Sequence, residues 1–221
     1  MSFNFISKAY FTRETIATGK KRLIFCLCYH ARMETEYEAK FLNADKDEIR
    51  TRLKAARASL ERSEFLQRRW VMDLPGEKNT RDAFVRVRDE GGIMTLTWKE
   101  YPGGVVNHPK EIEIIVDDFD KTVELMTQLG CVARSYQENR RELWHLDDAK
   151  ITIDSWPFVE PFVEIEGANE SVIETISKKV GFDWSVAVFS GVNRVYKMKF
   201  GDKVQIREMP KLTFDMPNPF V

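Results

Sequence analysis

Residues of like charge recur at every second position in four short segments, and this spacing constrains the fold more than any other feature of the sequence. The pairs are Glu36 and Glu38, Arg86 and Arg88, Glu111 and Glu113, and Glu164 and Glu166. Residues two apart in a β-strand project from the same face, about 7 Å from each other. Like charges at that spacing repel one another unless a group of opposite sign lies between them. The pattern therefore predicts strands whose charged faces point together around a charged ligand.

The alternate positions of these and neighbouring segments are apolar, which predicts a second, buried face. Its members are Val85 and Val87, Met94, Leu96 and Trp98, Ile112, Ile114 and Val116, Ile151 and Ile153, and Val163 and Ile165. We expect helices to cover this face. An alternative is an ordinary amphipathic sheet with a solvated, salt-bridged polar face. Because the doubling of like charges is repeated over four segments, the sequence favours a charged cavity.

Three helices are predicted between strand segments. The first spans about 45–61, capped by Asp45 with Glu48 completing a capping box, the second about 118–129, and the third from Asn169 to Gly181. The predicted buried stripes are Ile49, Leu53, Ala56 and Leu60; Val123, Met126 and Leu129; and Val172, Ile173, Ile176 and Val180. Strands are expected at 83–89, 93–100, 110–116, 141–146, 150–156 and 162–167.

The sequence contains an internal repeat. The segment RSEFLQRRW (62–70) follows the first predicted helix, and RSYQENRRELW (134–144) follows the second. A strand with the pattern Glu-x-Glu precedes each of these helices. Two related strand–helix–strand halves that close on each other predict a barrel rather than an open sheet.

Charge and cysteine content limit the classes of function. The 34 basic and 35 acidic residues give a net charge of −1, which argues against a general nucleic-acid binder. The apolar run at 23–29 is too short to cross a membrane. The odd count of three cysteines fits a reducing compartment, so we expect a cytoplasmic protein.

The first 32 residues differ in charge from the rest of the chain. They hold six basic residues and one acidic residue, a net charge of +5, and Met33 opens the first well-patterned segment. A basic leader of this kind is compatible with a transit peptide. The simpler interpretation is that 1–32 is a dispensable N-terminal extension and that 33–221 forms a single domain.

The two kinds of charged pair suit two parts of one ligand. Paired carboxylates supply the hard oxygen ligands that Mg²⁺ and Mn²⁺ prefer. The arginines at 86 and 88, together with Lys99, supply the forked and point cations that bind phosphate oxygens. A metal-chelated polyphosphate satisfies both sets at once, and the chemistry would be phosphoryl or nucleotidyl transfer.

The run Glu36-Tyr-Glu38-Ala-Lys40 resembles the ExExK signature of the CYTH superfamily, the triphosphate tunnel metalloenzymes. This superfamily includes class IV adenylyl cyclases, thiamine triphosphatases and inorganic triphosphatases. The resemblance continues through RVR (86–88), Lys99, KEIEIIVDDF, RRELW, ITIDSW and PFVEIEG, and covers about 33–200 in the expected order. It implies an α+β fold in which a closed antiparallel β-barrel of about eight strands encloses a tunnel, with helices packed outside.

The resemblance also implies the roles of individual residues. The expected ligands of Mg²⁺ or Mn²⁺ are Glu36, Glu38, Asp154, Glu164 and Glu166. The expected substrate-phosphate contacts are Lys40, Arg86, Arg88, Lys99 and Arg141, and the expected catalytic residues are Glu36, Glu38, Lys40 and Glu113. Members of the family often carry lysine where this chain has Asn139, so one phosphate contact is either missing or supplied by Arg140.

Three functions are open. We favour a class IV-type adenylyl cyclase that converts ATP to cyclic AMP and pyrophosphate, because of the compact length from Met33 and the class IV-like C-terminal half. The alternatives are a tripolyphosphate or thiamine triphosphate hydrolase and a non-catalytic polyphosphate-binding module. In each case the partner is a small triphosphate, with neither nucleic acid nor membrane, and the resemblance allows a homodimer.

Overall fold

The computed structural model describes residues 8–15, 21–28, 34–76, 82–101 and 109–221, so Met33 lies outside the described residues. The chain divides into two units, 1–33 and 34–221. The first unit holds an antiparallel hairpin of β1 (Lys8–Thr15) and β2 (Lys21–Cys28). The second unit holds the charged segments, and the rest of the description concerns it.

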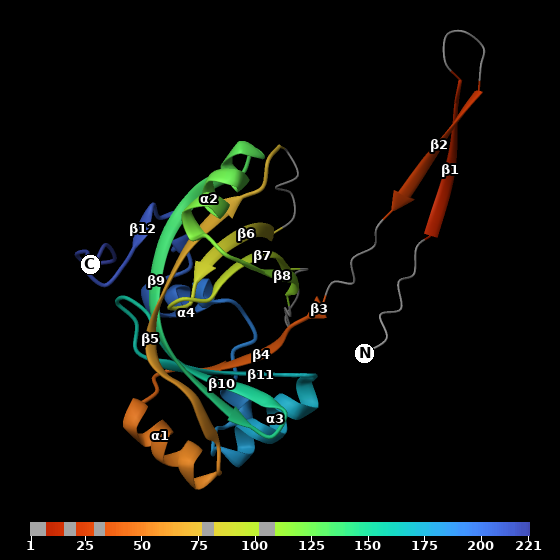
Figure 1. Cartoon of the computed structure of the whole chain (residues 1–221). Helices are drawn as coiled ribbons and strands as arrows, with labels where there is room; N and C mark the ends of the chain where they lie inside the picture. Colours follow the sequence, from red (N-terminus) through yellow and green to blue (C-terminus); the bar gives the residue numbers. More distant parts are fainter. Residues whose placement is uncertain (1–7, 16–20, 29–33, 77–81, 102–108) are drawn as a thin grey trace. The chain divides into compact units, whose positions relative to one another are not determined.

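Eight strands of the second unit form one antiparallel sheet that curls into a half-barrel (Figure 1). They are β4 (Tyr37–Phe41), β5 (Ser59–Asp73), β6 (Asp82–Asp89), β7 (Met94–Tyr101), β8 (Lys110–Val116), β9 (Val132–Leu146), β10 (Ala149–Ser155) and β11 (Phe162–Gly167). Their order in the sheet is β8-β7-β6-β5-β9-β10-β11-β4. Two short strands join the sheet, since β3 (Glu34–Thr35) pairs with β8 and β12 (Lys211–Leu212) pairs with β9.

The strand order reflects the internal repeat. Each half of the unit contains a short strand, a helix, a fifteen-residue strand and two further strands, and the two long strands β5 and β9 pair at the centre of the sheet. The first strand of each half pairs with the last strand of the other half, so β8 lies beside β7 and β4 lies beside β11. The two halves thus complete one another's sheet, as the repeat predicts.

The prediction of a closed barrel is slightly overstated. Among the described residues, the two ends of the sheet meet where β3 pairs with β8, with Glu34 opposite Glu111 and Thr35 opposite Lys110, and where the N–H of Glu36 donates to the carbonyl of Pro109 at 3.0 Å. Farther along the same segment, the free edge of β4 turns to a different partner. The backbone of Lys40 exchanges two hydrogen bonds of 3.0 Å with Val188, from the C-terminal part of the chain. The result is a half-barrel with its concave face open on one side.

In the described part of the second unit, four α-helices accompany the sheet, namely α1 (Lys46–Ala55), α2 (Phe119–Gln128), α3 (Glu170–Lys179) and α4 (Val192–Phe200). The side chains of Asp45, Asp118 and Asn169 accept hydrogen bonds from backbone N–H groups at the starts of α1, α2 and α3, and this cap was predicted for Asp45. The sequence did not indicate α4. None of the helices in these described ranges combines the length and the apolar character needed to span a membrane.

The end of the first helix and the burial of one residue of the second were predicted wrongly. Helix α1 ends at Ala55, Arg57 adopts a positive φ of 66°, and β5 begins at Ser59. Leu60 therefore belongs to a strand and is exposed rather than buried under the helix. Leu129, at the end of α2, is also exposed.

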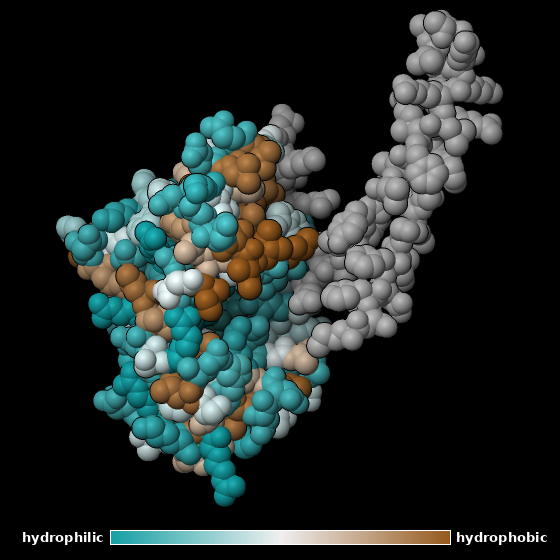
Figure 2. All heavy atoms as spheres, viewed as in Figure 1, coloured by the Kyte–Doolittle hydropathy of each residue, from teal (hydrophilic) through white to brown (hydrophobic). Residues whose placement is uncertain are grey.

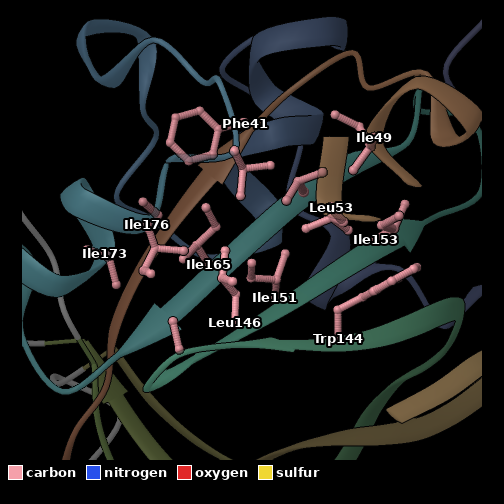
Figure 3. Packing of buried hydrophobic residues seen from close by; sticks show 14 residues of the cluster. Phe41, Ile49, Leu53, Trp144, Leu146, Ile151, Ile153, Ile165, Ile173 and Ile176 are labelled. Atoms are coloured by element: carbon pink, nitrogen blue, oxygen red, sulfur yellow. The ribbon is translucent and has the colours of Figure 1, made fainter. Parts of the chain in front are cut away.

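The largest apolar cluster lies between the sheet and helices α1 and α3. Figure 3 shows side chains from both helices gathered against β4, β10 and β11. Ile49 and Leu53 of α1 and Ile173 and Ile176 of α3 are almost fully buried there. Burying each such side chain stabilises the fold by about 1.5–3 kcal/mol. Because this face of the strands is fixed outward against the helices, the alternate, charged face must point into the concavity.

The outer face of β8 is an exception to the predicted helix cover. Helix α2 packs with Val85 and Val87 of β6, but Ile112 and Ile114 of β8 are 38% and 52% exposed. Figure 2 shows an apolar area on this side of the molecule, beside α2. The expectation that helices cover every apolar strand face is therefore wrong for β8.

We propose that the second unit folds without the first 32 residues. A protein that begins at Met33 should unfold within about 2 °C of the full chain, because the clusters of buried residues lie within 34–221. Differential scanning calorimetry of both forms measures this. A melting temperature lower by about 5 °C or more would show that the extension contributes to the folded domain.

Candidate active site

The concave face of the sheet encloses a cavity of about 280 Å³ whose wall is mostly charged. Its acidic residues are Glu36, Glu38, Glu90, Glu111, Glu113, Glu164 and Glu166. Its basic residues are Lys40, Arg69, Arg86, Arg88, Lys99, Arg141 and Lys150. The structure thus brings together all the predicted site residues except Asp154.

The charges are not mixed evenly, and one side of the cavity forms an acidic pole of Glu36, Glu38 and Glu164. Two lysines lie among these carboxylates. Lys40 Nζ lies 2.8 Å from Glu38 Oε1 and 2.9 Å from Glu164 Oε2, while Lys99 Nζ contacts Glu36. Strand register produces this grouping, because Glu164 of β11 stands directly opposite Lys40 of β4, and Glu166 stands opposite Glu38.

Burial and mutual repulsion perturb the carboxylates of the acidic pole. Burial raises the pKa of Glu38 to about 7, and the neighbouring charges of Glu164 and Glu36 add to this rise against the opposing effect of Lys40. Burial also works against the ionisation of Glu164, but Lys40 and Arg141 outweigh it and hold the pKa of Glu164 well below its usual range. Lys40 is shared by Glu38 and Glu164, and Arg141 also contacts Glu164. Glu38 is therefore the carboxylate with the least compensation, and a further cation beside it would stabilise its ionised form.

The other side of the cavity forms an arginine pole of Arg69, Arg86, Arg88 and Arg141. Arg88 Nη2 lies 3.3 Å from Glu113 Oε2 and 2.6 Å from Glu90 Oε1, and Arg86 Nη2 lies 3.5 Å from the same Glu113 oxygen. Burial, together with the charge of Arg86, lowers the pKa of Arg88 to about 10.

Several donors of the arginine pole remain unused. The buried Nε atoms of Arg69, Arg86 and Arg88 have no hydrogen-bond partner among the residues that the structure describes. Buried N–H groups without an acceptor are costly, and guanidinium groups bind phosphate oxygens strongly. An anion with several oxygens would satisfy these donors.

A family comparison agrees with this geometry. The model of the CYTH domain matches residues 34–180 of the chain. The chain belongs to the CYTH family. The matched range runs from the start of β3 to the end of α3 and so contains both poles of the cavity.

Solved structures share the CYTH fold. A candidate adenylate cyclase from Vibrio parahaemolyticus aligns with a TM-score of 0.64 at 12% identity, over 75% of this chain and 99% of that one. The PH1012 protein from Pyrococcus horikoshii OT3 aligns with a TM-score of 0.61 at 18% identity, over 72% of this chain and 98% of that one. The PH1819 protein from the same organism aligns with a TM-score of 0.58 at 22% identity, over 74% of this chain and 99% of that one. The comparison with curated proteins found no match.

Asp154 lies beneath the CYTH cavity rather than in its wall. Its carboxylate is fully buried and accepts hydrogen bonds of 2.8 Å from both Nε and Nη2 of Arg141, 3.0 Å from Asn139 Nδ2 and 2.8 Å from Thr152 Oγ1. These partners occupy both carboxylate oxygens and fix the guanidinium of Arg141 toward Glu164, at 3.4 Å. The metal role expected for Asp154 stays a prediction, and the contacts shown are those of an orienting group.

Sequence reasoning missed several residues that line the CYTH cavity. Arg69 lies in β5, where Gln67, Arg69 and Val71 alternate as buried positions, a signal that recognition of the strand would have revealed. Tyr101 also lines the wall, and burial raises its pKa to about 12. The C-terminal segment reaches this tyrosine at Gly191, where an added Cβ would lie 2.6 Å from the Tyr101 hydroxyl oxygen.

Arg140 does not take a phosphate contact in this arrangement. It is exposed on the outer face of β9, and its guanidinium lies 5.1 Å from the ring centroid of Phe214. Of the two alternatives left open by the sequence, the position of Arg140 favours a missing contact. Asn139, the neighbouring residue, points inward and contacts Arg69.

The acidic pole fits a divalent cation by the chemistry of its donors. The carboxylates of Glu36, Glu38 and Glu164 offer hard oxygen atoms on adjacent strands. No three histidine, cysteine, aspartate or glutamate side chains within the described part of the chain already converge as a metal site. Lys40 and Lys99 lie among the carboxylates of the acidic pole. A bound cation would relieve the repulsion that raises the pKa of Glu38.

Proposed function

We propose that this CYTH protein is a divalent-metal-dependent enzyme that binds a triphosphate substrate in its cavity. The observation that carries the proposal is the uneven distribution of charge within one cavity, where three carboxylates gather around two lysines and four guanidinium groups gather beside them. A simple anion would suit only the arginine pole, and a bare cation only the acidic pole. A metal-chelated triphosphate suits both.

Each group of residues has a distinct task in this proposal. Arg86, Arg88 and Arg141 bind non-bridging phosphate oxygens, and Glu113 holds the first two in place through its contacts with both. Glu36, Glu38 and Glu164 hold Mg²⁺ or Mn²⁺, which would neutralise the developing charge on the phosphates. Lys40 and Lys99 keep their charge although both are buried. Nearby carboxylates raise the pKa of Lys40, and Tyr101 and Glu36 raise the pKa of Lys99. Asp154 orients Arg141.

Among triphosphate reactions we favour cyclisation of ATP, because the cavity wall also carries aromatic residues. Phe65 of β5 and Phe84 of β6 line it on two of the strands that carry the arginine pole, and Trp156 lines it in the loop after β10. Inorganic tripolyphosphate has no apolar group to contact these rings, whereas a nucleotide has a base that can contact them. In the reaction the ribose 3′-hydroxyl attacks the α-phosphorus, the bond from that phosphorus to the bridging oxygen breaks, and pyrophosphate leaves as the hydroxyl proton is released.

Product analysis distinguishes the cyclase from its alternatives. The full chain is incubated with Mn²⁺ and, in separate reactions, with ATP, tripolyphosphate and thiamine triphosphate, and the products are separated by chromatography. We expect cyclic AMP and pyrophosphate in equal amounts from ATP. Orthophosphate from tripolyphosphate, with no cyclic nucleotide from ATP, would identify a hydrolase instead. Binding of these ligands without turnover of any would identify a polyphosphate-binding module.

A further inference from the structure

Arg69 is a buried cation without a carboxylate partner. Its side chain lines the cavity, and the residue is only 6% exposed. Its Nη2 donates to Gln67 Oε1 at 3.2 Å and to Asn139 Oδ1, both neutral oxygens, and its guanidinium lies 4.7 Å from the ring centroid of Trp156. Its Nε has no acceptor, and none of the carboxylates in the described ranges forms an ion pair with it.

The neighbours of Arg69 make its position more costly still. It stands directly opposite Arg88 in the pairing of β5 with β6, so two like charges face each other across the sheet. Burial and the charges of Arg88, Arg86 and Arg141 hold the pKa of Arg69 well below its usual range. Amide oxygens and one aromatic ring compensate such a charge only in part.

A purely structural role does not explain this arrangement. The inward neighbours of Arg69 include Gln67 and Gln137, which are uncharged and fully buried, so β5 and β9 accommodate amide side chains at this depth. A glutamine at position 69 would fill similar space without repelling Arg88. Retention of the guanidinium is understandable if a multiply charged anion enters the pole.

Arg69 also lies at the end of the cavity away from the acidic pole. Its strand β5 lies at the centre of the sheet, with three strands between it and either β3 or β4, the two strands between which Glu36 lies and the second of which carries Glu38. A chain of phosphates that begins at a metal on the acidic pole reaches Arg69 last. A diphosphate held at the same metal is one phosphate shorter and would therefore not reach Arg69.

We propose that Arg69 binds the phosphate group farthest from the metal, and so makes the site select triphosphates over diphosphates. This inference rests on the proposed function, because it assumes that the arginine pole holds the substrate phosphates. It adds a fourth guanidinium to the three that the sequence indicated, and it gives Arg69 a role in substrate choice rather than in folding.

The test compares ligand affinity in the full chain and two variants, in buffer with Mn²⁺, because the proposed register begins at the metal and neither ligand has the ribose hydroxyl that cyclisation needs. Isothermal titration calorimetry measures tripolyphosphate and pyrophosphate separately. Arg69→Gln should weaken tripolyphosphate binding by about 10- to 100-fold and pyrophosphate binding by less than about 3-fold. Arg68→Gln is the matched control, since this neighbouring arginine lies on the outer face and pairs with Asp89 at 3.0 Å. It should leave both affinities within about 2-fold of wild type.

Thermal unfolding without ligand separates binding from structure. Arg69→Gln should melt at the same or a higher temperature than wild type, because a repulsive buried charge is removed. Unchanged tripolyphosphate affinity in Arg69→Gln, or equal losses for both ligands, would overturn the inference while leaving the proposed function intact. Failure of the wild-type protein to bind tripolyphosphate at all would instead overturn the proposed function.

Discussion

Replacement of Glu36 by glutamine is expected to abolish metal-dependent turnover while the protein remains folded. A neutral amide is a poor ligand for a hard divalent cation, and the change also removes the carboxylate that pairs with Lys99. We expect kcat to fall by at least about 100-fold and the concentration of Mn²⁺ needed for half-maximal activity to rise. Steady-state kinetics across a Mn²⁺ titration measure both quantities.

Glu170→Gln serves as the control for this prediction. Glu170 is an exposed glutamate in the first turn of α3, outside the cavity, so its replacement removes one negative charge without touching the site. It should keep wild-type kinetics. If Glu36→Gln retains full activity with an unchanged Mn²⁺ dependence, the acidic pole does not hold the metal.

Replacement of Arg88 by glutamine should affect the substrate rather than the metal. Arg88 lies at the centre of the arginine pole, opposite Arg69 and in contact with Glu113 and Glu90. Losing a charge-assisted hydrogen bond to phosphate should raise KM for the triphosphate by about 10- to 100-fold. The Mn²⁺ dependence measured at saturating substrate should change by less than about 3-fold.

The opposite pattern would refute the assignment of the two poles. A raised requirement for Mn²⁺ with an unchanged KM in Arg88→Gln would place the metal among the arginines. Arg140→Gln is the matched control, because Arg140 is exposed on the outer face of β9. We expect its KM to equal that of wild type.

The sequence predicted the charged wall well because alternation is a local signal. Where one face of a strand is packed under a helix, as at Ile151 and Ile153 of β10, period-2 alternation fixes which residues point inward. The same logic placed Glu164, Arg86 and Lys99 in the cavity. These assignments required no knowledge of which strands are neighbours.

Features that depend on strand partners were not predictable from alternation. The first half of β5 is largely exposed on both faces, so its residues show no period-2 signal, and Leu60 was assigned to the preceding helix. The role of Asp154 depends on its register, which places it directly opposite Arg141 of β9. The incomplete closure of the barrel depends on a two-residue pairing of β3 with β8. Such long-range pairings leave no mark in either segment alone.

The most direct test of the account is a crystal structure of the protein with Mn²⁺ and tripolyphosphate, with the metal located by its anomalous scattering. We predict Mn²⁺ at the acidic pole, at about 2.2 Å from oxygens of Glu36, Glu38 or Glu164 and bridged to the ligand. Phosphate oxygens should lie about 2.7–3.0 Å from guanidinium nitrogens of Arg86, Arg88 and Arg141. Tripolyphosphate bound outside the cavity, or within it with no metal at the carboxylates, would contradict the account.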